Sequence, residues 1–173
     1  RDVLAEWSGL GYYARARNLH RAAKAVAAVG AFPATLEGWR ALPGVGAYTA
    51  AAVASIAFGV PEPAVDGNVV RVICRLRALR LDPKAPATLA RVRALARPLV
   101  PKSNPGDFNQ ALMELGSQVC TPRQPKCEEC PLAALCPTRK LGLTASIPAP
   151  KKPKKYEEVV EAVVVIRRGN KVF

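Results

Sequence analysis

The chain has 173 residues, half of them apolar, and 26 lysine and arginine residues against 13 aspartate and glutamate residues give it a formal net charge of +13. This length allows one sizeable hydrophobic core or two small ones, and no apolar run is long enough to cross a membrane. The positive charge favours a polyanionic partner, above all nucleic acid, although charge alone leaves a merely basic soluble protein open. The start at Arg1 shows neither an initiator methionine nor a signal-peptide pattern, so we expect a fragment of a soluble protein.

Alanine- and leucine-rich stretches broken by glycine and proline predict an all-α region from residue 2 to about residue 136. Gly30 lies where a helix would end, and Thr35, Asp66 and Asn104 lie where N-caps are expected. The expected helices cover residues 2–8, 13–29, 36–41, 48–58, 67–79, 87–99, 105–118 and 131–135.

The helical pattern stops near residue 137. Three prolines and a lysine-rich run predict a basic linker over residues 138–155. The β-branched residues 159–166 predict a strand, followed by a turn at 167–170 and a second strand at 171–173. We therefore expect a helical region over 1–137, a linker over 138–155 and the start of a β-containing domain over 156–173.

Four of the five cysteines follow the pattern C-x6-C-x2-C-x5-C, at Cys120, Cys127, Cys130 and Cys136. The short gaps allow one looped segment to deliver four thiolates to a metal centre. Structural zinc sites usually pair two C-x2-4-C knuckles, and only one occurs here, so the spacing favours a 4Fe-4S cluster over zinc. Disulfides are disfavoured because the sequence carries no secretory signal. The remaining cysteine, Cys74, is expected to be a buried structural thiol.

Residues 42–50, with the sequence LPGVGAYTA, separate two expected helices. Gly44 and Gly46 permit a sharp turn and a close approach to a ligand, and the first amides of the following helix point outward. Such a hairpin can hold a phosphate at the positive end of the helix dipole without reading bases. An ordinary connector between helices is the alternative that this motif alone leaves open.

Residues 42–50, residues 65–72 (VDGNVVRV) and the cysteine quartet follow the order found in the helix-hairpin-helix DNA glycosylase superfamily, which the chain resembles over residues 2–139. Three features resemble the MutY-type adenine glycosylase branch rather than endonuclease III. Residues 7–20 (WSGLGYYARARNLH) are similar to its signature, Tyr48 stands where endonuclease III has a Schiff-base lysine, and Asp66 is followed by Gly-Asn. The resemblance implies a helix-hairpin-helix fold with a 4Fe-4S cluster and a C-terminal Nudix-like α+β domain that begins near residue 156.

Cleavage of an N-glycosidic bond leaves positive charge on the sugar and negative charge on the base, so a carboxylate near the sugar and an acid near the base are needed. The resemblance implies that Asp66 stabilises the sugar cation, that Asn68 positions the site and that Tyr48 lies in the pocket. By itself, Asp66 would more often be a helix N-cap. The resemblance also places the protonating glutamate upstream of Trp7. Glu6 does not match that position, so we expect this chain to lack the general acid.

The DNA contacts expected from the resemblance are a wedge that fills the gap left by a flipped base, at Tyr12, together with the hairpin and nearby arginines. The expected contact residues are Tyr12, Leu42, Gly44, Val45, Gly46, Arg15 and Arg71, with Arg17, Arg75 and Arg77 as weaker candidates.

The resemblance therefore predicts a monomeric, monofunctional adenine DNA glycosylase of base excision repair. It would act on double-stranded DNA that contains A:8-oxoguanine or A:G mispairs, in the bacterial cytoplasm or the eukaryotic nucleus. Two alternatives remain: an endonuclease III-like glycosylase and lyase, and a non-catalytic DNA-binding module that would bind matched and mismatched duplexes alike.

Overall fold

The computed structural model describes residues 2–150, 158–169 and 171–172 of the chain. The α-helices are α1 (Asp2–Glu6), α2 (Tyr13–Val29), α3 (Leu36–Arg40), α4 (Ala47–Phe58), α5 (Gly67–Leu76), α6 (Pro86–Ala96), α7 (Pro105–Glu114) and α8 (Pro137–Lys140). Shorter helical turns are η1 (Arg97–Leu99), η2 (Leu115–Val119), η3 (Cys127–Glu129) and η4 (Ala133–Leu135). The expected helical region is therefore present, and each expected helix has a counterpart.

The helix ends follow local chemistry where a capping side chain is available. The Thr35 side chain accepts a hydrogen bond from the Gly38 amide at 3.1 Å at the start of α3. Gly30 ends α2 in the left-handed conformation at φ 80°. Asn104 precedes α7 as expected, but its side chain makes no capping bond.

Several expected helices end earlier than the sequence indicated; α6, for example, ends at Ala96 and continues as the 3-10 turn η1. Instead of one helix over 105–118, α7 ends at Glu114 and continues as the π-helical turn η2. Instead of one helix over 67–79, α5 ends at Leu76. Helix α8 was not expected at all, because its four residues are too short for a periodic signal.

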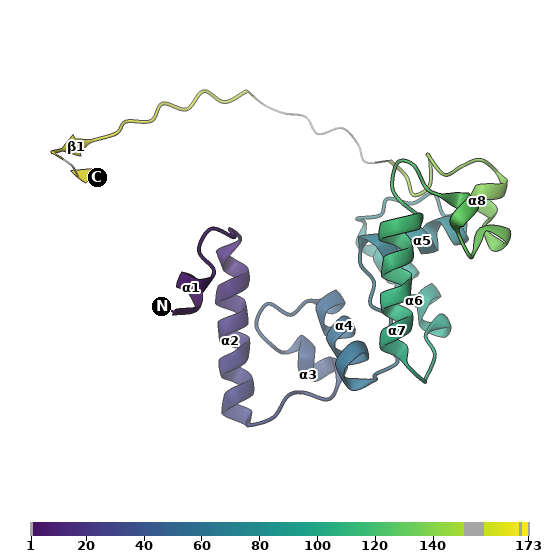
Figure 1. The fold of residues 1–173 in the computed structure, drawn as a ribbon, viewed down its shortest axis with the longest axis horizontal. Helices are drawn as coiled ribbons and strands as arrows, with labels where there is room; N and C mark the ends of the chain where they lie inside the picture. Colours follow the sequence, from purple (N-terminus) through teal and green to yellow (C-terminus); the bar gives the residue numbers. More distant parts are fainter. Residues whose placement is uncertain (1, 151–157, 170, 173) are drawn as a thin grey trace.

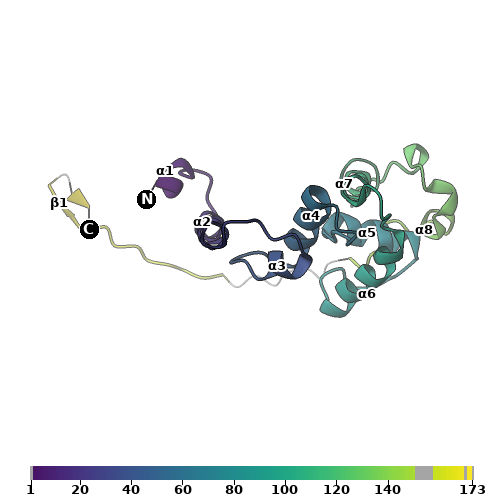
Figure 2. The same cartoon turned by 90° about the horizontal axis from the view of Figure 1, so that it is seen from below.

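The hydrophobic core is centred on α5, which is apolar on most faces. Its side chains Val69, Val72 and Ile73 are each 1% exposed and pack with Val92 of α6 and Leu112 of α7. Figures 1 and 2 show α6, α7 and α8 beside this helix and α4 between α3 and α7, whereas α1 and α2 lie to one side and join α3 through residues 30–35. Asp66, the N-cap of α5, is therefore attached to a helix that close packing in the core holds in place.

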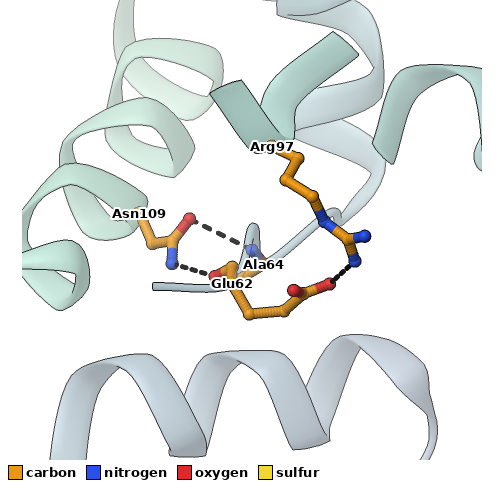
Figure 3. A network of polar contacts seen from close by, with 4 residues as sticks. All are labelled: Glu62, Ala64, Arg97 and Asn109. Atoms are coloured by element: carbon orange, nitrogen blue, oxygen red, sulfur yellow. Dashed lines mark hydrogen bonds and ion pairs between the residues drawn. The ribbon is translucent and has the colours of Figure 1, made fainter. Parts of the chain in front are cut away.

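The segment that leads from α4 into α5 is held by one buried amide (Figure 3). Asn109 of α7 is 1% exposed; its Oδ1 accepts from the Ala64 amide at 3.0 Å, and its Nδ2 donates to the Glu62 carbonyl oxygen at 2.9 Å. The Glu62 carboxylate pairs with Arg97 at 2.6 Å. The Asn109 side chain thus satisfies backbone groups of the segment between α4 and α5 that no helix or strand would satisfy. These bonds hold in place the residues that precede Asp66.

The predicted linker is only partly a linker. Thr138 lies in α8 and is fully buried, Ile147 is 2% exposed within the core, and the Ala149 amide donates to the Leu81 carbonyl oxygen at 3.0 Å. Residues 138–149 thus pack on the helical region, because Arg75 and the Leu81 carbonyl bind their backbone and Ile147 is apolar. Of the remaining predicted linker, residues 151–155 lie outside the described residues.

The C-terminal residues form one short antiparallel pair, β1 (Arg167–Arg168) with β2 (Lys171–Val172). The predicted strand over 159–166 is wrong: these residues have no regular structure, and Val160 is 97% exposed. A strand needs a hydrogen-bonded neighbour, and residues 159–166 pair with none of the described residues. No helix in the described part of the chain is long and apolar enough to span a membrane.

Candidate active site and metal centre

Asp66 occupies the N-cap of α5 and presents its carboxylate at a cleft. Its Oδ1 accepts from the Val69 amide at 2.7 Å, and its Oδ2 accepts from the Asn68 side-chain amide at 2.9 Å. The cap and the active-site interpretations of Asp66 are therefore compatible, since the capping bond fixes the carboxylate in one orientation. The cleft measures about 680 Å³ and has the cationic side chains Lys84 and Arg123 on its wall.

A chain of hydrogen bonds runs from Asp66 to the cysteine loop. Arg71, one turn after Asn68 on α5, donates from Nη2 to Asn68 Oδ1 at 2.8 Å and to the Gly116 carbonyl at 2.6 Å. Its Nε donates to the Cys120 carbonyl at 2.7 Å. Partial burial lowers the pKa of Arg71, and the nearby Cys120 and Asp66 oppose that shift. The orientation of Asn68, and through it that of Asp66, therefore depends on where the cysteine loop lies.

The π-helical turn η2 brings a glycine against this network. Gly116 is buried, and a Cβ added to it would lie 2.6 Å from the Asn68 Cβ. Only a residue without a side chain permits this approach, and π-turns recur at functional sites because they displace one residue from the helical register. Gly116 is part of no recognisable sequence motif, so the sequence alone does not indicate its contact with Asn68.

The four cysteines of the quartet line one small cavity of about 30 Å³. Burial raises the pKa of Cys127, and its neighbours Cys120, Cys136 and Cys130 raise it further, as expected for thiols that face one another. Among the described residues, no three Cys, His, Asp or Glu side chains converge as ligands of a single ion would. The four thiols nevertheless line one site, as the ligands of a single metal centre would.

The glycine hairpin lies between α3 and α4, as the sequence predicted. The Val45 amide donates to the Leu42 carbonyl at 3.1 Å, which closes the turn, and Gly46 is the N-cap of α4. Gly44 has φ +76°, and a Cβ on it would lie 2.5 Å from the Asn18 side chain of α2. Around Gly46 a Cβ would meet nothing within 4 Å, so the first turn of α4 is open to a ligand.

The profile of the HhH-GPD superfamily of base excision DNA repair proteins matches residues 1–98, which include the hairpin and Asp66. The chain belongs to this superfamily. The iron-sulfur binding domain of endonuclease III matches residues 120–136, the span of the cysteine quartet. The expected superfamily and the expected iron–sulfur cofactor are both confirmed.

Curated proteins that resemble the chain include adenine DNA glycosylases of eukaryotes and bacteria. The human protein is 50% identical over 141 residues, which are 80% of this chain and 26% of the human one. The protein of Buchnera aphidicola from Schizaphis graminum is 34% identical over 174 residues, 99% of this chain and 50% of that one. The chain thus spans between about a quarter and a half of the length of these relatives.

Solved superfamily structures share the fold. A thermostable thymine-DNA glycosylase superposes with a TM-score of 0.65 at 37% identity, covering 73% of this chain and 59% of that one. A trapped endonuclease III–DNA covalent intermediate superposes with a TM-score of 0.63 at 31% identity, covering 78% and 62%. The helix-hairpin-helix glycosylase fold is therefore established for the helical region.

The other predicted site residues of this superfamily member are spread over several elements. Tyr48, in the first turn of α4, is 42% exposed, and its hydroxyl lies 3.4 Å from Met113 Sδ of α7. Tyr12 precedes α2 at φ 47° and is 82% exposed, as a side chain that enters DNA would have to be. Arg15 is exposed on the next turn. In the described part of the chain no hydrogen bond or ion pair joins Tyr48, Tyr12 or Arg15 to Asp66, and their roles remain predictions.

Arg75 does not fit a phosphate contact. It is 2% exposed, and its guanidinium donates to backbone carbonyls and to Cys120 Sγ. Arg71 also directs its guanidinium at protein acceptors, so a direct DNA contact by Arg71 stays a prediction. In the sequence both arginines look like one basic face of a helix, because helical spacing cannot tell a solvated face from one that a later loop covers.

Proposed function

We propose that the chain is the catalytic region of an adenine DNA glycosylase that hydrolyses the N-glycosidic bond of adenine mispaired with 8-oxoguanine or guanine. The single observation that carries the proposal is the Asp66 carboxylate, anchored by two hydrogen bonds at 2.7 and 2.9 Å and facing a cleft with cationic walls. Relatives named adenine DNA glycosylases, from human to Buchnera, support the choice of base.

In this proposal Asp66 supplies negative charge beside the sugar as the bond to the base breaks. Both carboxylate oxygens are held before the substrate arrives, so little reorganisation is needed when positive charge develops on the deoxyribose. Asn68 holds the carboxylate, and Arg71 holds Asn68. The four cysteines would hold the iron–sulfur cluster, which would supply structural support to the loop whose Cys120 carbonyl binds Arg71.

Tyr48 separates this function from that of a lyase. A phenol cannot form the iminium with the opened sugar that a lysine amine forms. The resemblance to endonuclease III structures, one of them a trapped covalent intermediate with DNA, keeps a lyase as the second candidate.

DNA is the partner that charge and fold support. The net charge is +13, the hairpin leaves the first turn of α4 open, and a related structure is a non-covalent endonuclease III–DNA complex. We infer that Leu42, Gly44, Val45 and Gly46 contact the phosphate backbone and that Tyr12 enters the base stack. We further infer a monomer, located with the DNA in the cytoplasm or the nucleus.

The domain organisation is also part of the proposal. Residues 158–172 would begin a separate Nudix-like domain that reads the base opposite the adenine, whereas residues 138–149 belong with the catalytic region because they pack on it. The antiparallel pair β1–β2 is compatible with such a beginning.

The test is single-turnover excision by the full-length protein on four duplexes: A:8-oxoguanine, A:G, A:T and thymine glycol:A. Release of adenine from the first two only, without strand cleavage until alkali is added, is the expected result. Release of the oxidised pyrimidine with strand cleavage would support the endonuclease III-like function. Binding to all four duplexes without release would support the non-catalytic module.

A further inference from the structure

Arg75 is the only charged side chain that is buried among the residues that the structure describes, with 2% of its surface exposed. It lies on α5 one turn after Arg71, in the wall of the cavity that the four cysteines line. A buried guanidinium cannot escape its charge by losing a proton, so its surroundings must compensate it.

All three guanidinium nitrogens of Arg75 donate hydrogen bonds. Nε donates to the Ile147 carbonyl at 2.9 Å, and Nη1 donates to the Thr121 carbonyl at 2.8 Å, to Cys120 Sγ at 3.3 Å and to the Cys120 carbonyl at 3.4 Å. Nη2 donates to the carbonyls of Thr144 at 2.8 Å and Pro122 at 3.2 Å. These acceptors belong to two segments, 120–122 and 144–147, and Arg71 and the core residue Ile147 add further contacts between α5 and the same segments. Arg75 therefore fixes both segments around the cavity.

Carbonyl oxygens satisfy hydrogen bonds but carry no net charge. The ion pairs among the described residues are Arg97–Glu62, Lys126–Glu129 and Arg139–Glu128, and none includes Arg75. A buried charge without a counter-charge is strongly destabilising, as it is when one partner of a buried ion pair is removed. An anion is thus expected beside Arg75, and within the described part of the chain the one group that hydrogen-bonds to its guanidinium and can become anionic is the Cys120 sulfur.

We propose that Arg75 is the buried counter-cation of the iron–sulfur cluster and that it favours the more reduced state of the cluster. A cluster held by four thiolates is an anion, and the loss of one electron makes it less negative. A fixed positive charge stabilises the more negative state more, and the N–H···S bond to Cys120 acts in the same direction. Arg75 therefore raises the potential at which the cluster is oxidised.

Two other cations line the cavity, but each already has a partner. Arg139 pairs with both carboxylate oxygens of Glu128 at 2.9 and 3.0 Å, and Lys126 lies 3.7 Å from Glu129. Both side chains are also exposed, so solvent and salt screen the part of their positive charge that the glutamate partners do not neutralise. Arg139 is therefore a matched control: a cation at the same cavity whose removal should matter little.

The experiment compares Arg75→Gln, Arg75→Lys and Arg139→Gln in the full-length protein with its cluster. Iron and sulfide are measured first, and then the potential of one-electron oxidation at an electrode that accepts the electron, with no bond made or broken. Arg75→Gln should oxidise at least ten times more readily at a given potential, a downward shift of about 59 mV or more. Arg75→Lys and Arg139→Gln should stay close to the wild type. A Gln variant with full iron and unchanged potential would overturn the proposal.

If no Arg75 variant retains iron, a second pair of variants tests the counter-cation role without changing Arg75. Thr144 lines the same cavity and gives Arg75 only its carbonyl oxygen, so Thr144→Glu adds a negative charge near Arg75 without removing a side-chain bond to it. Thr144→Gln has the same shape without the charge. The Glu variant should oxidise at the lower potential and lose iron faster in air. Equal potentials for the two variants would refute a counter-cation role and would leave Arg75 with a structural role only, that of binding the backbone carbonyls of the two segments.

Discussion

Gly116 lies so close to Asn68 that a Cβ on Gly116 would be 2.6 Å from the Asn68 Cβ and 3.1 Å from its Cα. The π-turn η2 therefore packs directly on the first turn of α5. Gly116 contacts Asn68, and Asn68 donates a hydrogen bond to the Asp66 carboxylate. Any side chain at Gly116 must move the start of α5.

Gly116→Ala should consequently impair both stability and excision. Overpacking of this kind costs about 1–3 kcal/mol, and a displacement of about 1 Å at a catalytic group can lower the rate about a hundredfold. Thermal unfolding and single-turnover excision measure the two effects. The control is Gly67→Ala, also beside Asp66, where a Cβ would meet nothing within 4 Å and stability should hold. Equal melting temperatures for both variants would contradict the predicted contact.

Asp66→Asn should abolish excision while leaving the fold intact. Asparagine caps a helix about as well as aspartate, so the bond to the Val69 amide survives, but the negative charge is lost. We expect the rate to fall by about a hundredfold to a thousandfold or more, with DNA affinity unchanged. Asp66→Ala should in addition lose about 0.5–2 kcal/mol of stability with the cap. An Asn variant with near wild-type rates would remove Asp66 from the mechanism.

Arg71→Lys distinguishes a positioning role from a phosphate contact. A lysine cannot reproduce the fork that joins Asn68 Oδ1, the Gly116 carbonyl and the Cys120 carbonyl. We expect slower excision at saturating DNA, with an unchanged dissociation constant and an unchanged dependence of binding on salt. If Arg71 contacts phosphate, Arg71→Gln should instead lower the slope of log affinity against log salt by about one, and this outcome would restore the sequence-based assignment.

Tyr48→Lys should gain strand cleavage. The side chain is 42% exposed in the first turn of α4, so a lysine fits there without burying its charge. Its amine could attack the opened sugar and form an iminium that borohydride traps as a protein–DNA adduct. Tyr48→Phe is the control and should trap nothing. Efficient trapping by the wild type would favour the endonuclease III-like function.

The two hairpin glycines should respond differently to alanine. Gly44→Ala combines a positive φ of +76° with a Cβ 2.5 Å from the Asn18 side chain, so it should destabilise the protein by at least about 1 kcal/mol. Gly46→Ala meets open space and should leave the melting temperature nearly unchanged. A bulkier Gly46→Val should weaken binding to matched and mismatched duplexes by similar factors, since the loop holds backbone phosphates. A loss confined to the mismatch would mean that the hairpin reads bases.

Much of the fold followed from local chemistry. Glycine and proline breaks marked the helix boundaries, Thr35 and Asp66 cap the helices at whose starts they stand, and the spacing of Cys120, Cys127, Cys130 and Cys136 indicated one cluster. The predicted strand over 159–166 failed because β-branched composition reports a preference for pairing, not the presence of a neighbour.

By itself, then, the sequence determined the features whose cause lies within a few residues: the helices, the caps at Thr35 and Asp66, the hairpin and the grouping of four cysteines on one loop. It could not determine what Arg71 and Arg75 do, because both look like solvated helix positions until residues 116–122 and 144–147 fold over them. Nor could it single out Gly116, whose neighbour Asn68 lies nearly fifty positions earlier. Only tertiary structure sets the burial and the partners of a charged side chain, because they depend on segments far apart in the chain that meet only when the core forms.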